Sequence, residues 1–306
     1  MDGEALNTFL MVYRQRGFSN AARALNRTQP AISHRISLLE QELGMSLFER
    51  TSNGIALSQA GRVLLPYAER ALAALQDAET AVRALKTEDA GPLSLAVVGT
   101  LASTSLTRIL KRFAADYPSV DLALQTTRST EVSDLVRRGE ATIGIRYDRD
   151  RSPDLHYERL GLEKMAVACS TDHDLAGRSI KSLAELVSEH WLAFPEIPGQ
   201  REIWASHVFS VFQTFGLGEI EWTPVDSLTA QKRLVEAGFG LALMTESAVA
   251  EERAAGTLAT IDVRDLTLTI PIFLVTRRDG FLSVAANRLR DSFKSDYLGH
   301  YEASAV

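Results

Sequence analysis

Three side chains near the amino end have the chemistry of a surface that reads DNA. We expect Gln29, Ser33 and His34 to lie in the amino-terminal part of a helix. Glutamine can pair with adenine through two hydrogen bonds, serine can donate or accept, and histidine can donate to guanine. A recognition helix reads bases from its amino-terminal turn, so Thr28 and Pro30 are expected to lie in the same interface. The alternative for Ser33 and His34 is that both are merely solvated.

A second set of polar residues follows closely along the chain. Arg50 is expected at the base of a hairpin, within reach of phosphate or of the minor groove, with Thr51 and Asn53 nearby. The alternative for Arg50 is an ion pair inside the domain with Glu40 or Glu42.

The charge distribution favours a nucleic-acid partner only locally. The net charge is −6, which by itself argues against attraction to phosphate. Between Ala5 and Leu39, however, there are five arginines and no acid. The basic charge is therefore concentrated where the predicted base-reading residues lie.

A third set of polar residues follows strand-like runs later in the chain. In open α/β sheets, ligands bind beyond the carboxyl ends of strands, where helix N-termini supply free N–H groups. Arginine can clamp a carboxylate with two hydrogen bonds, which predicts a small organic acid as the ligand. The residues expected to contact it are Thr100, Ser103, Thr104, Thr127, Arg128 and Arg146, with Phe239 as an apolar wall. The alternatives are that Ser103 and Thr104 only cap a helix, and that Arg146 or Arg128 pairs with Asp148 or Glu131.

Three helices and a hairpin must position the DNA-reading residues. Helical apolar spacing and capping residues predict the helices, and an Asn-Gly dipeptide predicts the tight turn of the hairpin. The predicted elements are a helix at Leu6–Tyr13, a helix at Asn20–Leu25 capped by Ser19, a helix from Thr28 to Leu43 with Ile32, Ile36, Leu39 and Leu43 buried, and a hairpin at Leu47–Leu57. This order is typical of a winged helix-turn-helix.

A long helix is predicted from Ser58 to about Lys86. Its apolar stripe alternates spacings of four and three residues, which favours pairing with a partner helix. The stripe consists of Leu64, Ala68, Ala71, Leu75, Ala78, Val82 and Leu85. The alternative is a helix that lies on its own domain.

Beyond a seam at Thr87–Pro92, strands and helices alternate, which predicts a parallel sheet with right-handed crossovers. The predicted strands are 93–98, 120–126, 141–147, 162–168 and 270–275, and the predicted helices are 106–117, 131–138, 182–189, 202–215, 228–237 and 284–293.

Composition and motifs exclude several classes of protein. With 45% apolar and 24% charged residues in 306, the chain is expected to fold into a small and a larger globular unit. The single cysteine, Cys169, is expected to be a buried hydrophobe, and neither metal site nor cofactor is predicted. No leader and no window of roughly 20 apolar residues is present, which predicts a cytoplasmic protein without membrane contact.

The rival functions are those of an enzyme and of a cytoplasmic solute-binding module. Nucleotide-binding glycine loops, zinc-protease motifs and nucleophile elbows are all missing from the sequence, so no catalytic residue is predicted and an enzyme is disfavoured. A cytoplasmic solute-binding module remains a second alternative, which the helix-turn-helix pattern disfavours.

Several linked motifs between Phe9 and Leu65 resemble one known family, the LysR-type transcriptional regulators. They are GFSNAARAL from Gly17, TQPAIS from Thr28, ISLLEQELG from Ile36, LFER from Leu47 and LSQAG from Leu57. Segments at 114–118, 235–243 and 273–278 resemble the family's sensor domain more loosely. A run of motifs in register over about sixty residues is specific.

The resemblance implies a winged helix-turn-helix, a linker helix and a bilobed α/β sensor with the fold of periplasmic binding proteins. The implied boundaries are 1–58 for the DNA-binding domain, 59–90 for the linker and dimerisation helix, and 91–306 for the sensor, with lobe I at 91–161 and 270–306 and lobe II at 162–269. Gln200 and Arg201 are implied to line the cleft between the lobes. The implied partners are double-stranded promoter DNA, a small effector, further copies of the chain forming a homodimer and then a homotetramer, and RNA polymerase.

Overall fold

The computed structural model describes most of the chain. The described residues are 1–51, 54–85, 91–102, 104–150, 152–195, 212 and 220–303. Four predicted site residues, Asn53, Ser103, Gln200 and Arg201, lie outside these ranges, as does most of the predicted helix 202–215, and the side chain of Thr104 is not described.

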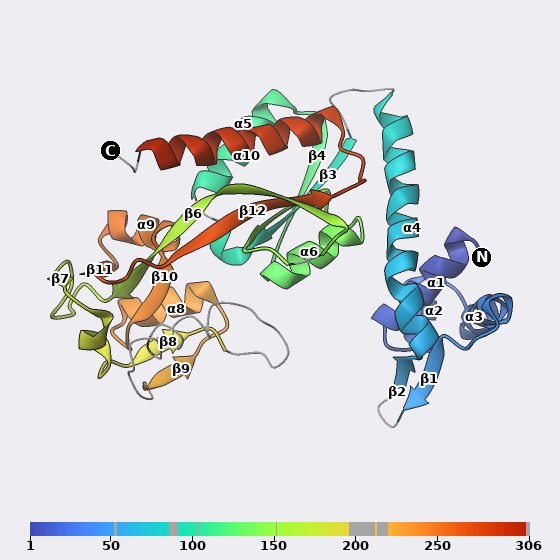
Figure 1. The fold of residues 1–306 in the computed structure, drawn as a ribbon, viewed down its shortest axis with the longest axis horizontal. Helices are drawn as coiled ribbons and strands as arrows, with labels where there is room; N and C mark the ends of the chain where they lie inside the picture. The colour runs from blue at the N-terminus through green and yellow to red at the C-terminus, as the bar shows by residue number, and fades with distance from the viewer. Residues whose placement is uncertain are drawn as a thin grey trace.

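The fold class is confirmed: a winged helix-turn-helix precedes a long helix and a bilobed α/β domain (Figure 1). The amino-terminal domain consists of α1 (Gly3–Arg14), α2 (Phe18–Ala24), α3 (Gln29–Leu43) and the antiparallel hairpin β1 (Phe48–Thr51) and β2 (Gly54–Leu57). Its core includes Phe9, Ile36 and Leu39, which are almost fully buried. The ring of Phe48 packs on Phe9 and Phe18, which anchors the wing to the helices.

Two details of this domain differ from the prediction. The second helix begins at Phe18 and its cap is Gly17, whose carbonyl accepts the Ala21 N–H at 3.0 Å, so Ser19 lies inside the helix. Leu43 is 39% exposed rather than buried. Apolar periodicity identifies the inner face of a helix, but it does not show how far along the helix the core extends.

Helix α4 (Gln59–Ala84) begins where the wing ends. The Ser58 hydroxyl caps it by accepting the Gly61 N–H at 3.0 Å. A Cβ atom at Gly61 would lie 2.2 Å from the Leu47 carbonyl oxygen, so only glycine allows this close approach between the helix and the wing.

Lobe I contains a sheet with helices on both faces. Its first elements are β3 (Gly91–Val98), the short 3-10 turn η1 (Gly99–Leu101), α5 (Thr104–Asp116), β4 (Val120–Thr127), α6 (Ser129–Arg137) and β5 (Ile143–Tyr147). Strand β3 pairs in parallel with β4 and β5. Helix α5 lies on the same side as the last helix, α10 (Val284–Ala303), while α6 covers the other face (Figure 1).

The predicted parallel pairing is found for β3, β4 and β5, but the sheet is not parallel throughout. Strand β12 (Thr269–Arg277) runs antiparallel to both of its neighbours, β5 and β6 (Leu155–Cys169). The pair β6 and β12 extends from one lobe into the other, with Ile270 opposite Glu163 near the middle of β6. These two long strands join the lobes (Figure 1).

Lobe II is built from shorter pieces than the sequence predicted. It contains β7 (Ser179–Ile180), the 3-10 turn η2 (Leu183–Leu186), β8 (Trp191–Ala193), β9 (Trp222–Pro224), α8 (Leu228–Glu236), β10 (Ala242–Thr245), α9 (Glu246–Ala255) and β11 (Ala259–Val263). The predicted helix at 182–189 is only the turn η2, closed by a capping box between Ser182 and Glu185. Strands β10 and β11 pair with β6, which continues the sheet into this lobe.

The buried residues confirm the role predicted for Cys169. Its side chain is fully buried in the sensor core, and burial raises the pKa of its thiol to about 11. The protein thus holds this cysteine as an unreactive hydrophobe. Within the described ranges, none of the helices has the length and apolarity that a membrane span requires.

Candidate DNA interface and effector cleft

The predicted base-reading residues lie together on the outer face of α3. Thr28 is the N-cap residue, and the side chains of Gln29 and His34 are exposed. The Gln29 amide donates to the Ser33 hydroxyl at 2.8 Å, so these two side chains are held beside each other. The buried stripe of α3 faces the opposite direction, which leaves this polar face open to a groove.

Arg50 on the wing is exposed and has no ion-pair partner among the described residues. The two acids that could have neutralised it are used elsewhere. Glu40 accepts the N–H groups of Leu47 and Phe48 at 2.6 and 3.4 Å, and Glu42 pairs with the amino terminus. The neighbouring Thr51 hydroxyl donates to the Gly54 carbonyl at 3.3 Å within the wing.

The basic cluster is partly neutralised from outside the acid-free stretch. Glu4 of α1 lies 2.8 Å from the Arg35 guanidinium and 3.9 Å from that of Arg27. Arg14 lies 2.6 Å from Glu140 of lobe I and therefore points at the sensor domain. Counting arginines along the sequence overstates the positive charge available for DNA.

The predicted effector residues occupy the carboxyl ends of neighbouring parallel strands. Thr100 lies in η1 directly after β3, Thr127 ends β4, and Arg128 is the exposed N-cap residue of α6. Strand β3 lies between β4 and β5, so these positions and Arg146 share one edge of the sheet. Phe239 lies apart from them in lobe II, 64% exposed in the turn between α8 and β10.

Arg146 is buried and has several partners. Its guanidinium donates to the Tyr147 carbonyl at 3.1 Å and to the Ser133 hydroxyl, and it pairs with Asp150 at 3.1 Å. The acid is therefore neither Asp148 nor Glu131, the two pairings considered from the sequence. Asp148 has a φ of +51°, and the loop after β5 turns there so that Asp150 faces the arginine.

A polar cluster between the lobes was not identified from the sequence. The Tyr147 ring is fully buried, and its hydroxyl is contacted by the Thr100 side chain of lobe I and the Thr245 side chain of lobe II. Burial and the nearby Glu163 raise the pKa of Tyr147 well above its usual value, although both threonine hydroxyls oppose that shift. Tyrosine at the end of an apolar strand is indistinguishable from core in the sequence, and only the fold places it between the lobes.

Glu163 belongs to the same interlobe cluster. Burial raises the pKa of its carboxyl, against hydrogen bonds from the side chain and backbone of Ser247 at the start of α9. Helix α9 also contacts η1 across the lobes. Residues of both lobes therefore meet at this cluster.

Two family models together match nearly the whole chain. Residues 4–62 match the bacterial regulatory helix-turn-helix protein of the lysR family, and residues 86–297 match the LysR substrate binding domain. The HTH-type transcriptional regulator CbbR of Rhodospirillum rubrum is 30% identical over 284 residues, which cover 93% of each chain. The RuBisCO operon transcriptional regulator of Allochromatium vinosum is 27% identical, with 95% of each chain covered.

Solved structures of full-length regulators have the same architecture. The structure of CbnR complexed with its target DNA has a TM-score of 0.65 at 25% identity, and covers 97% of this chain and 100% of that one. A full-length OxyR variant from Pseudomonas aeruginosa has a TM-score of 0.69 at 19% identity, with 97% and 94% covered.

Proposed function

The chain belongs to the LysR family of DNA-binding transcriptional regulators, and from that premise we propose that it senses a small organic acid bound between the two lobes of its effector-binding domain. The families and relatives that it matches are transcriptional regulators, and it too is a regulator and not an enzyme. Such a protein acts in the cytoplasm, beside the chromosome it regulates.

The shared sheet edge of Thr100, Thr127 and Arg128 is the observation that carries the effector proposal. The amino end of α6 follows β4 directly, and Arg128 is exposed there without an acidic partner in the described part of the chain. An arginine beside a helix N-terminus favours an anion over a neutral ligand. Arg146 lies at the same edge of the sheet, but its side chain is buried and its charge is paired with Asp150.

For DNA we propose that Gln29, Ser33 and His34 read base edges while Arg50 contacts the backbone or the minor groove. The exposed outer face of α3 supports the first part, and the Arg50 guanidinium, which has no ion-pair partner in the described part of the wing, supports the second. Thr28, Pro30, Thr51 and Asn53 complete the proposed surface.

We also propose that α4 pairs with α4 of a second copy, and that two dimers form a tetramer, with RNA polymerase as a further partner. Along the predicted stripe, Leu64 and Ala68 pack on the chain's own DNA-binding domain. The later part remains open: Leu75 is 53% exposed, Val82 63% and Leu85 85%. Apolar side chains at this spacing need a cover, and a second α4 supplies one with the same spacing.

Calorimetric titration of the full-length protein with a panel of dicarboxylates and their neutral amides tests the effector proposal. We expect an acid to bind, and Arg128→Ala to weaken it by at least about tenfold, because a charged hydrogen-bond pair is lost. Footprints on the neighbouring intergenic DNA, with and without that acid, would then show the regulatory response. Tight binding of a neutral ligand that neither Arg128→Ala nor Arg146→Ala diminishes would contradict the proposal.

A further inference from the structure

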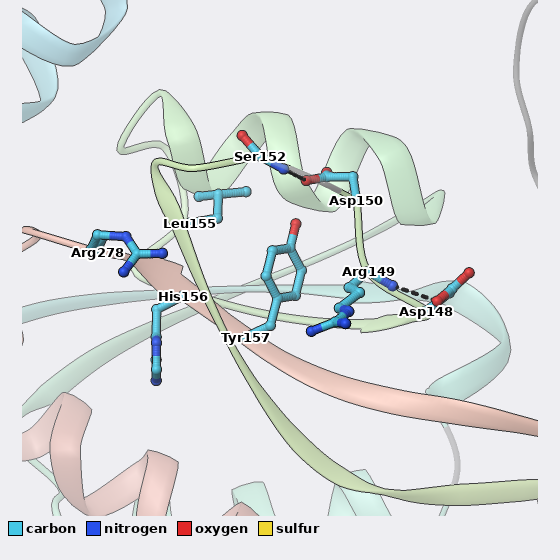
Figure 2. Close-up of a pocket in the computed structure, with 8 residues that line it drawn as sticks. All are labelled: Asp148, Arg149, Asp150, Ser152, Leu155, His156, Tyr157 and Arg278. Carbon is cyan, nitrogen blue, oxygen red and sulfur yellow. Dashed lines mark hydrogen bonds between the residues drawn. The ribbon is translucent and has the colours of Figure 1, made fainter.

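A polar cavity of about 580 Å³ opens on lobe I (Figure 2). It is lined by the loop after β5, the first residues of β6 and one residue after β12, namely Asp148, Arg149, Asp150, Ser152, Leu155, His156, Tyr157 and Arg278. A volume of this order suits a small metabolite. Every lining residue comes from lobe I, so the cavity is distinct from the proposed cleft between the lobes.

Of the two acids in this cavity, Asp150 is paired with a cation, whereas Asp148 has no ion-pair partner among the described residues. Asp150 pairs with Arg146 at 3.1 Å and accepts the Ser152 N–H at 3.0 Å. Burial alone would raise its pKa, but hydrogen bonds from Tyr157, Ser152 and Ser133 and the charge of Arg146 lower it. Asp148 accepts the backbone N–H of Arg149 at 2.8 Å, as the dashed line in Figure 2 shows.

The cations in the cavity are not compensated. Within the described part of the chain, no carboxylate lies within ion-pair distance of the Arg149 guanidinium, and Arg278 donates only through Nε, to the Pro153 carbonyl at 2.8 Å. Figure 2 places Arg149 and His156 on either side of Tyr157, with Arg278 beyond His156. Among the described residues, these two guanidinium groups thus keep free N–H donors at the cavity. His156 and Tyr157 line it too, but His156 lies 3.9 Å from Glu158, and the Tyr157 hydroxyl lies 3.1 Å from that of Ser133.

We propose that the cavity is a second ligand site, selective for a small oxyanion that binds to both Arg149 and Arg278. Both phosphate esters and carboxylates present the paired oxygens that a guanidinium fork recognises. The Tyr157 ring, which packs edge-on against Phe273, forms the floor.

The same loop contacts α6, which in turn lies near the DNA-binding domain. Arg137 of α6 donates to the Ser152 hydroxyl at 3.1 Å and to Asp154 at 3.0 Å. The next residue, Arg138, pairs with Glu140 at 3.1 Å, and Glu140 in turn pairs with Arg14 of the DNA-binding domain. The proposed site is therefore linked through α6 and Glu140 to Arg14 of α1.

The test is calorimetric titration of the full-length protein with two probes, sodium phosphate and disodium succinate. We expect one or both to bind, and Arg149→Ala/Arg278→Ala to weaken that binding by at least about tenfold, since two charged donors are removed. Arg112→Ala, which removes an exposed arginine of α5, is the matched control and should bind as the wild type does. Both replaced arginines are exposed, so the double variant is expected to fold normally.

The two probes identify the source of the oxyanion, because binding of phosphate alone assigns the site to phosphate esters and binding of succinate alone assigns it to carboxylates. No heat from either probe, or binding that the double variant leaves within about twofold, would overturn the proposal. The double variant keeps Arg128, so a cleft ligand should still bind it, and retardation of promoter DNA should be unchanged. Failure of this site is therefore separable from failure of the proposed function.

Discussion

At the scale of single residues, Arg50 is an exposed arginine that has no ion-pair partner among the described residues. Its two candidate partners are engaged elsewhere, as Glu40 shows by accepting two backbone N–H groups of the wing. In contrast, Arg14 and Arg35 are paired with acids at 2.6 and 2.8 Å. An exposed guanidinium on a hairpin, with no acidic partner among the residues that the structure describes, is available to release counterions from DNA.

Arg50→Ala should therefore weaken binding to all DNA sequences alike. We expect the plot of log K against log salt to become shallower by about one unit, because one phosphate contact is lost. Gln29→Ala is the matched variant: it should keep the slope and lose preference at one base pair, at a cost of about 1–3 kcal/mol. Gel-shift titrations at several salt concentrations measure both. An unchanged slope with lost sequence preference for Arg50→Ala would contradict the assignment.

Glu163 makes stability depend on pH. Its folded-state pKa is raised by burial, so its contribution to folding is fully present below the unfolded pKa and is lost as the pH rises through the folded value. Glu163→Gln removes this loss, and its melting temperature relative to the wild type should rise between about pH 4 and pH 8. Thermal unfolding across that range is the measurement, with Glu79→Gln on an exposed face of α4 as the control. A difference between variant and wild type that is independent of pH would argue against a buried carboxyl.

Residue types predicted some of the site and missed other parts for identifiable reasons. The polar face of α3 follows from helical spacing alone, and the structure has the same residues on that face. Tyr147 was missed because an aromatic residue in an apolar strand resembles core, and it is indeed fully buried. For Arg146, predicted to contact the effector, the alternative was a pair with Asp148 or Glu131. Its partner is instead Asp150, because the backbone turns at Asp148, which the sequence does not show.

At the scale of elements, the contact between α6 and β5 depends on one glycine. A Cβ atom at Gly144 would lie 2.7 Å from the Val132 side chain and 2.9 Å from that of Val136, both on α6. Both valines are fully buried, so neither side chain has free space to move into.

Gly144→Ala should accordingly destabilise the protein by about 1–3 kcal/mol, the usual cost of overpacking a core. Gly99→Ala is the control, because a Cβ atom there meets nothing within 4 Å. Denaturant unfolding of both variants compares the two positions. If Gly144→Ala proved as stable as Gly99→Ala, the close packing of α6 on the sheet would be wrong.

Elements with long periodic patterns were predicted well, and short ones were not. Helix α4 spans Gln59–Ala84 within the predicted Ser58–Lys86, because 26 residues of helical spacing leave little ambiguity. Strands β8 and β9 have three residues each, and β10 has four apolar or small residues, which is too short for a period to be visible. The direction of β12 was predicted wrongly because apolar alternation is the same for parallel and antiparallel neighbours.

At the scale of the whole molecule, α4 contacts both the DNA-binding domain and lobe I. One face packs on the DNA-binding domain through Ala68, and another contacts lobe I, where Ala73 is buried. The third face carries the exposed apolar side chains proposed to meet a second copy. Helix α4 therefore lies between lobe I and the DNA-binding domain and also carries the proposed dimer contact (Figure 1).

The contact between α4 and lobe I is centred on Asp77. Its carboxylate pairs with Arg277 at the end of β12 and accepts the Phe281 N–H at 3.2 Å. Arg277 also donates to the Val136 carbonyl at 3.0 Å, so one side chain joins α4, α6 and β12. The side chains of this ion pair are only 20% and 15% exposed, which makes the pair stronger than one on the surface.

A double-mutant cycle with Asp77→Asn and Arg277→Gln measures this link. Each single change leaves a partly buried charge without its partner. The double variant should therefore be at least as stable as the less stable single variant, and the coupling free energy between the two side chains should be about 1–3 kcal/mol. The exposed pair Glu79 and Arg83, 3.7 Å apart on the same helix, is the matched control, for which we expect at most about 0.5 kcal/mol. Free energies of unfolding from denaturant titrations supply both cycles. Additive effects of the Asp77 and Arg277 changes would mean that α4 does not dock on lobe I through this pair in solution, and the route from the sensor to the DNA-binding domain would have to pass through Arg14 and Glu140 instead.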